Sequence, residues 1–337
     1  MSHQRRTRRN AAATSFESLE QKVLLTAVNL LGSGELKITG TNAVDNVEVR
    51  KVGDQVKVKV QGEGTTSFDA LDVSLITFRG KDGHDKFHNK TNIASEARGD
   101  AGKDTLIGGT ADDVLQGNGG RDDLRGRGGN DELRGGGGHD VMKGHAGKDD
   151  MFGGGGNDNM VGGADNDNMH GNAGDDTMAG GTGKDFVGGH EGDDNLSGGK
   201  DNDWVFGYAG DDIINGNDGK DLLAGGDDDD QLNGGDDADT IYGGAGNDTL
   251  NGGGFDNAAD YLQGQTGYDV FHNYEKWGGG WEDTLSDPTP WEVVHFHERF
   301  DFELPDDVFE PLDPILDIPE LDVPVLDLPD LPVFPRL

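Results

Sequence analysis

The sequence Gly-Gly-Gly-Gly-Asn-Asp-Asn-Met-Val at residues 153–161 is one of the nine-residue units that decide the fold of this chain. Such units follow one another without insertion from Gly99 to Asn251, which makes 17 units in 153 residues. The first position is Gly and the sixth is Asp in every unit, and the eighth is always an aliphatic residue or Met. An internal repeat of this regularity predicts a solenoid of stacked, similar turns.

Each unit divides into a glycine-rich half and a half of the form x-aliphatic-x. Glycine accepts the positive φ angles that a tight turn needs, so the first half predicts a turn. The second half predicts a short strand with one side chain pointing inward. Nine residues cannot close a layer, so we expect two units per turn, with every second unit stacked ~4.8 Å from the last. The 17 units then give eight or nine turns of an all-β, parallel β-solenoid.

The composition excludes several classes of protein. The 337 residues include 66 acidic and 28 basic side chains, for a formal net charge of −38, and there is no cysteine. Disulfides, thiol catalysis and cysteine-based zinc sites are therefore excluded. Nucleic acid and anionic membranes would be repelled by so negative a chain. The sequence contains no apolar run long enough to span a bilayer, so we expect no transmembrane segment.

The repeat also implies a bound cation. One inward aliphatic side chain in each unit buries too little apolar surface to offset the conformational entropy lost on folding. Stacking would also bring the sixth-position carboxylates into columns in which they repel one another. Carboxylate and carbonyl oxygens are the ligands of Ca²⁺, whereas Mg²⁺ prefers strict octahedral geometry and retained waters. A merely solvated acidic face would not require Asp at one fixed position in all the units.

The units resemble the RTX (hemolysin-type) calcium-binding nonapeptide Gly-Gly-x-Gly-x-Asp-x-U-x, where U is a large aliphatic residue. The resemblance covers residues 99–251 tightly and extends loosely to 80–88 and 252–272. It implies a parallel β-roll in which Ca²⁺ lies between turns, held by Asp side chains and turn carbonyls. Pairing each unit with the second unit after it implies at most about 15 ions. The implied side-chain ligands are Asp104, Asp113, Asp122, Asp131, Asp140, Asp149, Asp158, Asp167, Asp176, Asp185, Asp194, Asp203, Asp212, Asp221, Asp230, Asp239 and Asp248.

Five units depart from the motif at the fourth position, where a side chain replaces glycine. A side chain at a position that needs positive φ strains the turn. We therefore expect weaker sites around these units. The five residues are Ala111, Asp165, Asp201, Asp228 and Asp237.

Two segments precede the roll, which we place at residues 99–272. Residues 1–27 form either a targeting region or a disordered start with one short helix. Leu19–Leu25 partly resembles the LEPR-XLL motif of some exported bacterial proteins, with Gln21 in place of Pro and Lys22 in place of Arg. Residues 28–98 alternate apolar and polar side chains as strands do, with Gly53-Asp54 as a turn, and predict a small β-cap or irregular solenoid turns.

Two further segments follow the roll. Residues 273–304 contain Trp277, Trp281 and Trp291 and predict an aromatic cap over the last turn, with a carbohydrate-binding platform as the alternative. Residues 305–337 repeat Leu-Asp-x-Pro and predict an extended or disordered tail. By the resemblance, this tail stands where RTX proteins carry a secretion signal.

No catalytic motif is recognisable. His295-Phe296-His297-Glu298 lacks the His-Glu-x-x-His spacing, and no Gly-x-Ser-x-Gly elbow is present. The inward Met residues at 142, 151, 160, 169 and 178 are expected to fill the core instead of binding a soft metal. His139, His145, His170 and His190 fall at different places in their units and are expected to be exposed loop side chains, not zinc ligands.

These features predict a secreted or cell-surface calcium-binding protein that folds on binding extracellular Ca²⁺ and has no enzymatic activity. Two alternatives remain open at this point. One is a calcium-dependent adhesion or matrix module that binds polysaccharide or a surface layer. The other is an accessory domain of a secreted enzyme, although residues 28–98 are too few to form the catalytic domain.

Overall fold

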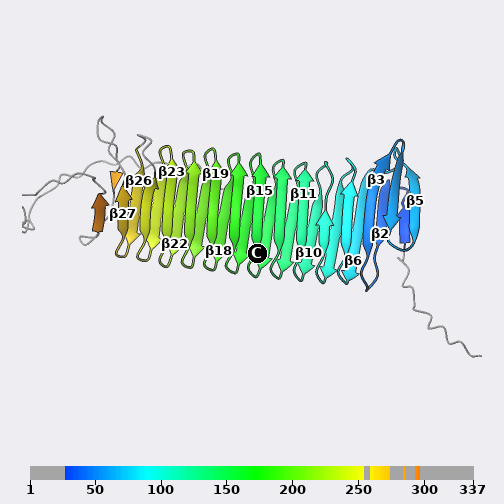
Figure 1. Ribbon diagram of the computed structural model, residues 1–337, viewed down its shortest axis with the longest axis horizontal. Coiled ribbons are helices and arrows are strands. Elements are labelled where there is room, and N and C mark those ends of the chain that lie inside the picture. Colours follow the sequence, from blue (N-terminus) through cyan, green and yellow to red (C-terminus); the bar gives the residue numbers. More distant parts are fainter. Residues whose placement is uncertain (1–26, 254–258, 274–283, 286–292, 297–337) are drawn as a thin grey trace, which may run out of the picture. The chain divides into compact units, whose positions relative to one another are not determined.

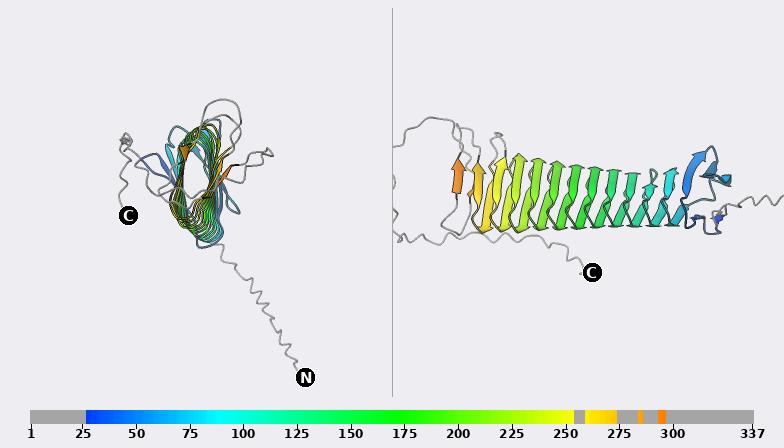
Figure 2. Two further views of the ribbon diagram at one scale, coloured as in Figure 1. Left: turned by 90° about the vertical axis from the view of Figure 1, so that its left-hand side faces the viewer. Right: turned by 60° about the horizontal axis from the view of Figure 1, so that its bottom comes forward.

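The computed structural model describes residues 27–253, 259–273, 284–285 and 293–296, all within one compact unit, Met1–His297. Every regular element in these residues is a β-strand, which confirms the predicted all-β fold. Figure 1 shows the strands of each sheet stacked side by side, and the end-on view in Figure 2 shows two sheets as the walls of a flattened tube. This is a parallel β-solenoid of about 11 turns.

The strands alternate between the two sheets along the chain. The first sheet contains, in spatial order, β1 (Ala27–Leu30), β2 (Glu35–Thr39), β6 (Leu75–Asp82), β8 (Ser95–Ala101), β10 (Val114–Gly119), β12 (Glu132–Gly137), β14 (Asp150–Gly155), β16 (Asn168–Ala173), β18 (Phe186–Glu191), β20 (Trp204–Ala209), β22 (Leu222–Asp227), β24 (Thr240–Ala245), β26 (Tyr261–Thr266) and β28 (Thr284–Leu285). The second contains β29 (Val293–Phe296), β27 (Val270–Asn273), β25 (Thr249–Gly253), β23 (Gln231–Asp236), β21 (Ile213–Asp218), β19 (Asn195–Lys200), β17 (Thr177–Thr182), β15 (Asn159–Ala164), β13 (Val141–Ala146), β11 (Asp123–Gly128), β9 (Thr105–Ile107), β7 (Lys86–Lys90), β3 (Asn46–Val52), β4 (Gln55–Val60) and β5 (Gly64–Asp69).

The register within the repeat is two units per turn, as predicted. Leu115 lies opposite Leu133 in the first sheet, and Met142 lies opposite Met160 in the second. Each eighth-position side chain points inward and is at most 2% exposed, so the core is two facing columns of Leu, Ile, Val and Met. The five methionines are core residues, in agreement with their predicted role.

Parallel stacking begins well before Gly99. Phe78 on β6 lies opposite Ala97, and Phe87 on β7 lies opposite Leu106. The two phenylalanine rings stack on each other in the core with centroids 5.0 Å apart. At the N-terminal end the antiparallel strands β1, β4 and β5 form the outermost strands, with Gly53 in the β3–β4 turn.

Most units have positive φ at their second and fourth positions. A Cβ on Gly138, whose φ is 137°, would collide with the carbonyl oxygen of Gly120 one turn earlier, so a side chain is excluded there. Four of the five fourth-position substitutions nevertheless keep the left-handed conformation, with φ between 73° and 77°: Asp165, Asp201, Asp228 and Asp237. Ala111 is not among the residues with positive φ, and β9, the strand just before its unit, spans only three residues.

The strands are longer than the x-aliphatic-x half of the unit. A typical strand such as β16 runs through the first three positions of the next unit, so glycine-rich residues take part in the sheet. For this reason the prediction that the histidines occupy loops is wrong for His145, His170 and His190, which lie on β13, β16 and β18. His139 lies in an exposed turn.

Some of the sequence-based predictions concern residues outside the described part of the chain. These are the N-terminal region 1–26, the three tryptophans of the expected aromatic cap and the tail 305–337. In the described residues no helix has the length and apolar character needed to cross a membrane.

Because Met160 is 1% exposed in the middle of the core column, Met160→Ala is expected to destabilise the calcium-saturated protein by about 2–5 kcal/mol. The matched variant Met160→Leu conserves volume and is expected to cost less than about 1.5 kcal/mol. Urea denaturation in excess Ca²⁺ measures both. Equal midpoints for the two variants would contradict the packing described here.

Candidate metal sites

The sixth-position aspartates lie at the end of each turn, directly before a strand, and are 0–3% exposed. In each of them Oδ1 accepts the backbone N–H of an aspartate or serine about one turn earlier in the chain. The Asp104 N–H donates to Asp122 Oδ1 at 2.7 Å, and the Asp140 N–H donates to Asp158 Oδ1 at 2.7 Å. We call such a chain of contacts an aspartate ladder.

Two aspartate ladders run along the roll. The first joins Asp45, Asp85, Asp104, Asp122, Asp140, Asp158, Asp176, Asp194, Asp212, Asp230, Asp248 and Asp269. The second joins Ser95, Asp113, Asp131, Asp149, Asp167, Asp185, Asp203, Asp221, Asp239 and Asp260. The structure thus brings all the predicted ligand residues into two columns.

The other carboxylate oxygen, Oδ2, is buried. In 15 of the 17 predicted residues it has no hydrogen-bond donor among the described residues. A buried carboxylate oxygen without a donor is costly unless a cation faces it. The 15 are Asp104, Asp122, Asp131, Asp140, Asp149, Asp158, Asp167, Asp176, Asp185, Asp194, Asp203, Asp212, Asp221, Asp230 and Asp248.

Each Oδ2 lies close to the first glycine of its unit, where a side chain would not fit. A Cβ built on Gly117 would meet both Asp122 Oδ2 and, at 2.7 Å, the carbonyl oxygen of Gly135 in the next turn. A Cβ on Gly153 would meet Asp158 Oδ2 and the carbonyl oxygen of Gly171 in the same way. Oxygen acceptors from two successive turns therefore lie close together beside these glycines, and oxygen is the ligand atom that Ca²⁺ takes.

Each site holds few carboxylates. In the described residues no group of three or more His, Asp or Glu side chains is placed to bind one ion. Backbone carbonyls of the turns must therefore complete the coordination of any cation bound beside Asp122 or Asp158. A hard cation with flexible coordination fits this arrangement better than Zn²⁺, which prefers nitrogen and sulfur ligands.

Burial raises the pKa of nearly all these carboxyls. It raises the pKa of Asp158 to about 7 and that of Asp167 to about 8. The carboxylates of neighbouring turns, Asp149 and Asp185, raise the pKa of Asp167 further by repulsion, while the N–H of Asp149 lowers it. Near neutral pH the ladders therefore need either protons or bound cations.

Asp113 differs from the other predicted ligands. Its Oδ1 accepts the backbone N–H of Ser95 at 2.6 Å and the Ser95 hydroxyl at 2.7 Å, and its Oδ2 accepts the Gly109 N–H at 2.6 Å. Both oxygens are satisfied by the protein, so Asp113 is the predicted ligand least suited to bind a cation. This unit is the one that carries Ala111.

Asp85 is a further candidate outside the repeat proper. Its Oδ2 is buried without a donor among the described residues, and a Cβ on Gly80 would meet that oxygen and the carbonyl of Gly99. The sequence signal is the Gly80-to-Asp85 spacing, which equals the first-to-sixth spacing of the repeat. Asp269 occupies the equivalent place at the other end of the first ladder, since its Oδ1 accepts the Asp248 N–H at 2.9 Å.

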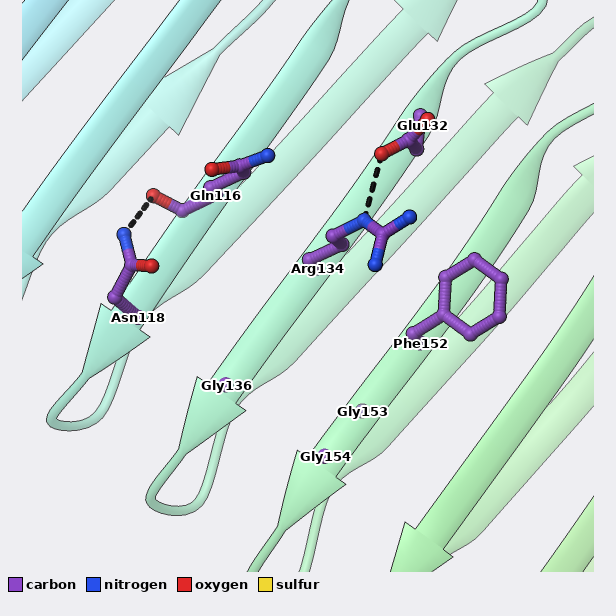
Figure 3. Close-up of a pocket in the computed structure, with 8 residues that line it drawn as sticks. All are labelled: Gln116, Asn118, Glu132, Arg134, Gly136, Phe152, Gly153 and Gly154. Atoms are coloured by element: carbon purple, nitrogen blue, oxygen red, sulfur yellow. Dashed lines mark hydrogen bonds and ion pairs between the residues drawn. The ribbon is translucent and has the colours of Figure 1, made fainter. Parts of the chain in front are cut away.

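A shallow hollow on the outside of the first sheet offers no comparable chemistry. Figure 3 shows Arg134 beside Glu132 and Phe152, with Gln116 and Asn118 one strand away. The Arg134 Nε lies 2.6 Å from Glu132 Oε1, and its guanidinium carbon lies 5.0 Å from the centre of the Phe152 ring. These are surface contacts of small energy, and the residues that line the hollow include no nucleophile–base pair.

A comparison with protein families matches the RTX calcium-binding nonapeptide repeat. The matched segments are residues 98–133, 126–160, 152–187, 188–223 and 224–259. Together they cover residues 98–259, or 162 of the 337 residues. Repeats of this family bind calcium. No curated protein matches the chain.

Replacing Asp158 by Asn is expected to abolish calcium binding at its own site. The same replacement at Asp113 is expected to leave the number of bound calcium ions unchanged. Asp158→Asn puts an amide group where the cation would face Oδ2, whereas Asp113 already has protein donors on both oxygens. Calorimetric titration is expected to show at least one ion fewer for Asp158→Asn and the wild-type number for Asp113→Asn. Equal losses in the two variants would contradict this assignment.

The raised pKa values predict that acid favours folding of the metal-free protein. These carboxyls have a pKa near 3.9 in an unfolded chain and about 6–8 in the roll, so the folded state binds more protons between these values. The resulting stability is complete below about pH 4 and is lost as the pH rises through 6–8. Circular dichroism of metal-stripped protein is expected to show more β-structure at pH 5 than at pH 8. Less β-structure at pH 5 than at pH 8 would contradict the prediction that acid favours folding.

Proposed function

We propose that this chain, whose residues 98–259 belong to the RTX calcium-binding nonapeptide repeats, is a non-catalytic protein that acts outside the cell and folds on binding calcium there. The observation that carries the proposal is the recurring buried Oδ2 of a sixth-position aspartate, which has no donor among the described residues and lies close to a glycine carbonyl of the next turn. Fifteen predicted aspartates have such a buried Oδ2.

The protein's own groups account for most of the site. Oδ1 of Asp158 is held in place by the N–H of Asp140, which orients Oδ2 toward the first glycine of the unit. Bound Ca²⁺ supplies the positive charge that compensates the buried carboxylates. With one ion between each unit and the second unit after it, the repeat would bind up to about 15 ions, and Asp113 would not ligate any of them.

Calcium concentration supports an extracellular site of action. Calcium-binding modules of extracellular proteins typically have dissociation constants of about 10⁻⁴–10⁻³ M, so such sites stay empty in the cytosol and fill outside the cell. A chain with a net charge of −38 repels itself when no cation is bound. We infer that the chain is exported in an extended form and becomes compact after release.

Removal of calcium is expected to unfold the repeat, because the two ladders then hold uncompensated buried charge. Circular dichroism and small-angle scattering near neutral pH should show an expanded chain with little β-structure after metal stripping. Added Ca²⁺ is expected to restore the compact state at concentrations at which Mg²⁺ does not. A metal-free sample as compact and as heat-resistant as the loaded one would refute the proposed function.

A further inference from the structure

A column of exposed side chains runs along one edge of the roll, directly before the aspartates of the first ladder. These residues stand at the fifth position of the unit or its equivalent, one in each turn that leads into the second sheet. Successive members are about 4.8 Å apart, because each turn of the solenoid adds one strand to each sheet. In chain order the column is His84, Lys103, Arg121, His139, Asn157, Asp175, Asp193, Asp211 and Asp229.

The column changes sign once along the roll. The four members before Asn157 are Lys, Arg or His, and the four after it are all Asp. The fifth positions beside the second ladder show no such change, since Lys alternates with Asn there from Asn130 to Lys220. Calcium bound in the turns would add positive charge to both halves and would leave the difference between them in place. One edge of the roll therefore has a basic half and an acidic half.

Hydrogen bonds hold the acidic half in position. The Asp211 N–H donates to Asp193 Oδ1 at 3.0 Å, and the Asp229 N–H donates to Asp211 Oδ1 at 3.0 Å. Among the described residues, no cationic side chain forms an ion pair with these carboxylates or with that of Asp175. Side chains that are already ordered lose less entropy when a partner binds.

The basic half is also ordered, and it borders a hollow. His84 Nδ1 accepts the Lys103 N–H at 2.7 Å, which leaves Nε2 as the nitrogen that carries the proton of the neutral ring. Within the described part of the chain, neither Lys103 nor Arg121 forms an ion pair. Both line a hollow of about 490 Å³ together with His84 and Lys86. Asp123 lines it too, but its carboxylate pairs with a neighbouring arginine.

We propose that this edge binds a second copy of the chain in an antiparallel dimer, with the two-fold axis beside Asn157. The column is self-complementary, because an axis at its middle member pairs each residue with the one equally far along on the other side. Each pair occurs twice, which gives eight contacts along about 40 Å of the edge. The pairs are His84 with Asp229, Lys103 with Asp211, Arg121 with Asp193, and His139 with Asp175 of the second copy.

Small residues on both sides of the axis let two such edges approach. In the turns of this edge from Ala101 to Gly210, the third and fourth positions are Gly or Ala except for Glu191. Glu191 lies in the layer of Asp193, so it would face Arg121 of the second copy and add to the attraction. A parallel arrangement would instead oppose like charges, which selects the antiparallel one.

The dimer depends on the whole row of charges. Exposed ion pairs are individually weak and are screened by salt, so the association is expected at low ionic strength. The inference goes beyond the proposed function and needs only that the roll is folded. All measurements are therefore made in saturating Ca²⁺, and calcium-induced circular dichroism verifies that each variant folds.

The test is sedimentation velocity of the full chain. The wild type is expected to form dimers at low ionic strength and to lose them in 1 M NaCl, where the screening length is about 3 Å. The double variants Lys103→Glu/Arg121→Glu and Asp193→Lys/Asp211→Lys are each expected to lose the dimer. The variant with all four changes is expected to regain it, because the reversed charges again face opposite charges.

The matched control is Lys148→Glu/Lys184→Glu, which changes the net charge as the basic double variant does but lies on the other edge. It is expected to keep the dimer. A wild type that remains monomeric at low ionic strength, a four-fold variant that does not regain the dimer, or equal loss in this control would each overturn the proposal.

A cysteine tests the position of the axis, since the chain has no cysteine of its own. Asn157→Cys places a thiol beside the two-fold axis and is expected to give a disulfide-linked dimer under mild oxidation at low ionic strength. Lys148→Cys lies on the other edge and is expected to stay monomeric. Equal cross-linking of the two variants would overturn the proposed arrangement.

Discussion

The structure depends on one buried oxygen atom that recurs in nearly every unit. Oδ1 of each sixth-position aspartate accepts a backbone N–H, whereas Oδ2 in most units has no donor among the described residues and lies close to a glycine carbonyl. The apolar core cannot compensate for this, because each unit contributes a single inward side chain such as Leu133 or Met160. By the proposed function, the parallel sheets, the tight turns and the two columns of carboxylates are stable together only when protons or bound cations compensate the buried charge.

Much of the fold could be predicted because the repeat is strict. A period of nine with two units per turn determines that Leu115 lies opposite Leu133, and the fixed sixth position determines the two columns of Asp. The extent of the solenoid was harder to predict, because residues 35–98 lack the full motif. Their strands still continue the sheets, since Phe78 and Phe87 occupy inward positions equivalent to those of the repeat.

The remaining features depend on contacts that a period does not encode. Asp113 is satisfied by Ser95, which lies outside the repeat, and by Gly109, whose role follows from an irregular turn. The contact between His170 and His190 joins the ninth position of one unit to the second position of a unit further along the chain. Such a diagonal contact becomes visible only when the strands are known to run on into the glycine-rich half of the unit.

The alternation of strands between two sheets restricts how a chain of this kind changes its length in evolution. Loss or gain of two consecutive units removes or adds one whole layer and leaves every later strand in its own sheet. Loss of a single unit would transfer every later strand to the opposite sheet. If the unit between Arg134 and Phe152 were lost, for example, these two residues would no longer lie on the same sheet. The pairing of Leu250 with Phe271, a longer step than the pairing of Leu232 with Leu250, shows that a few extra residues are accommodated between layers without such a transfer.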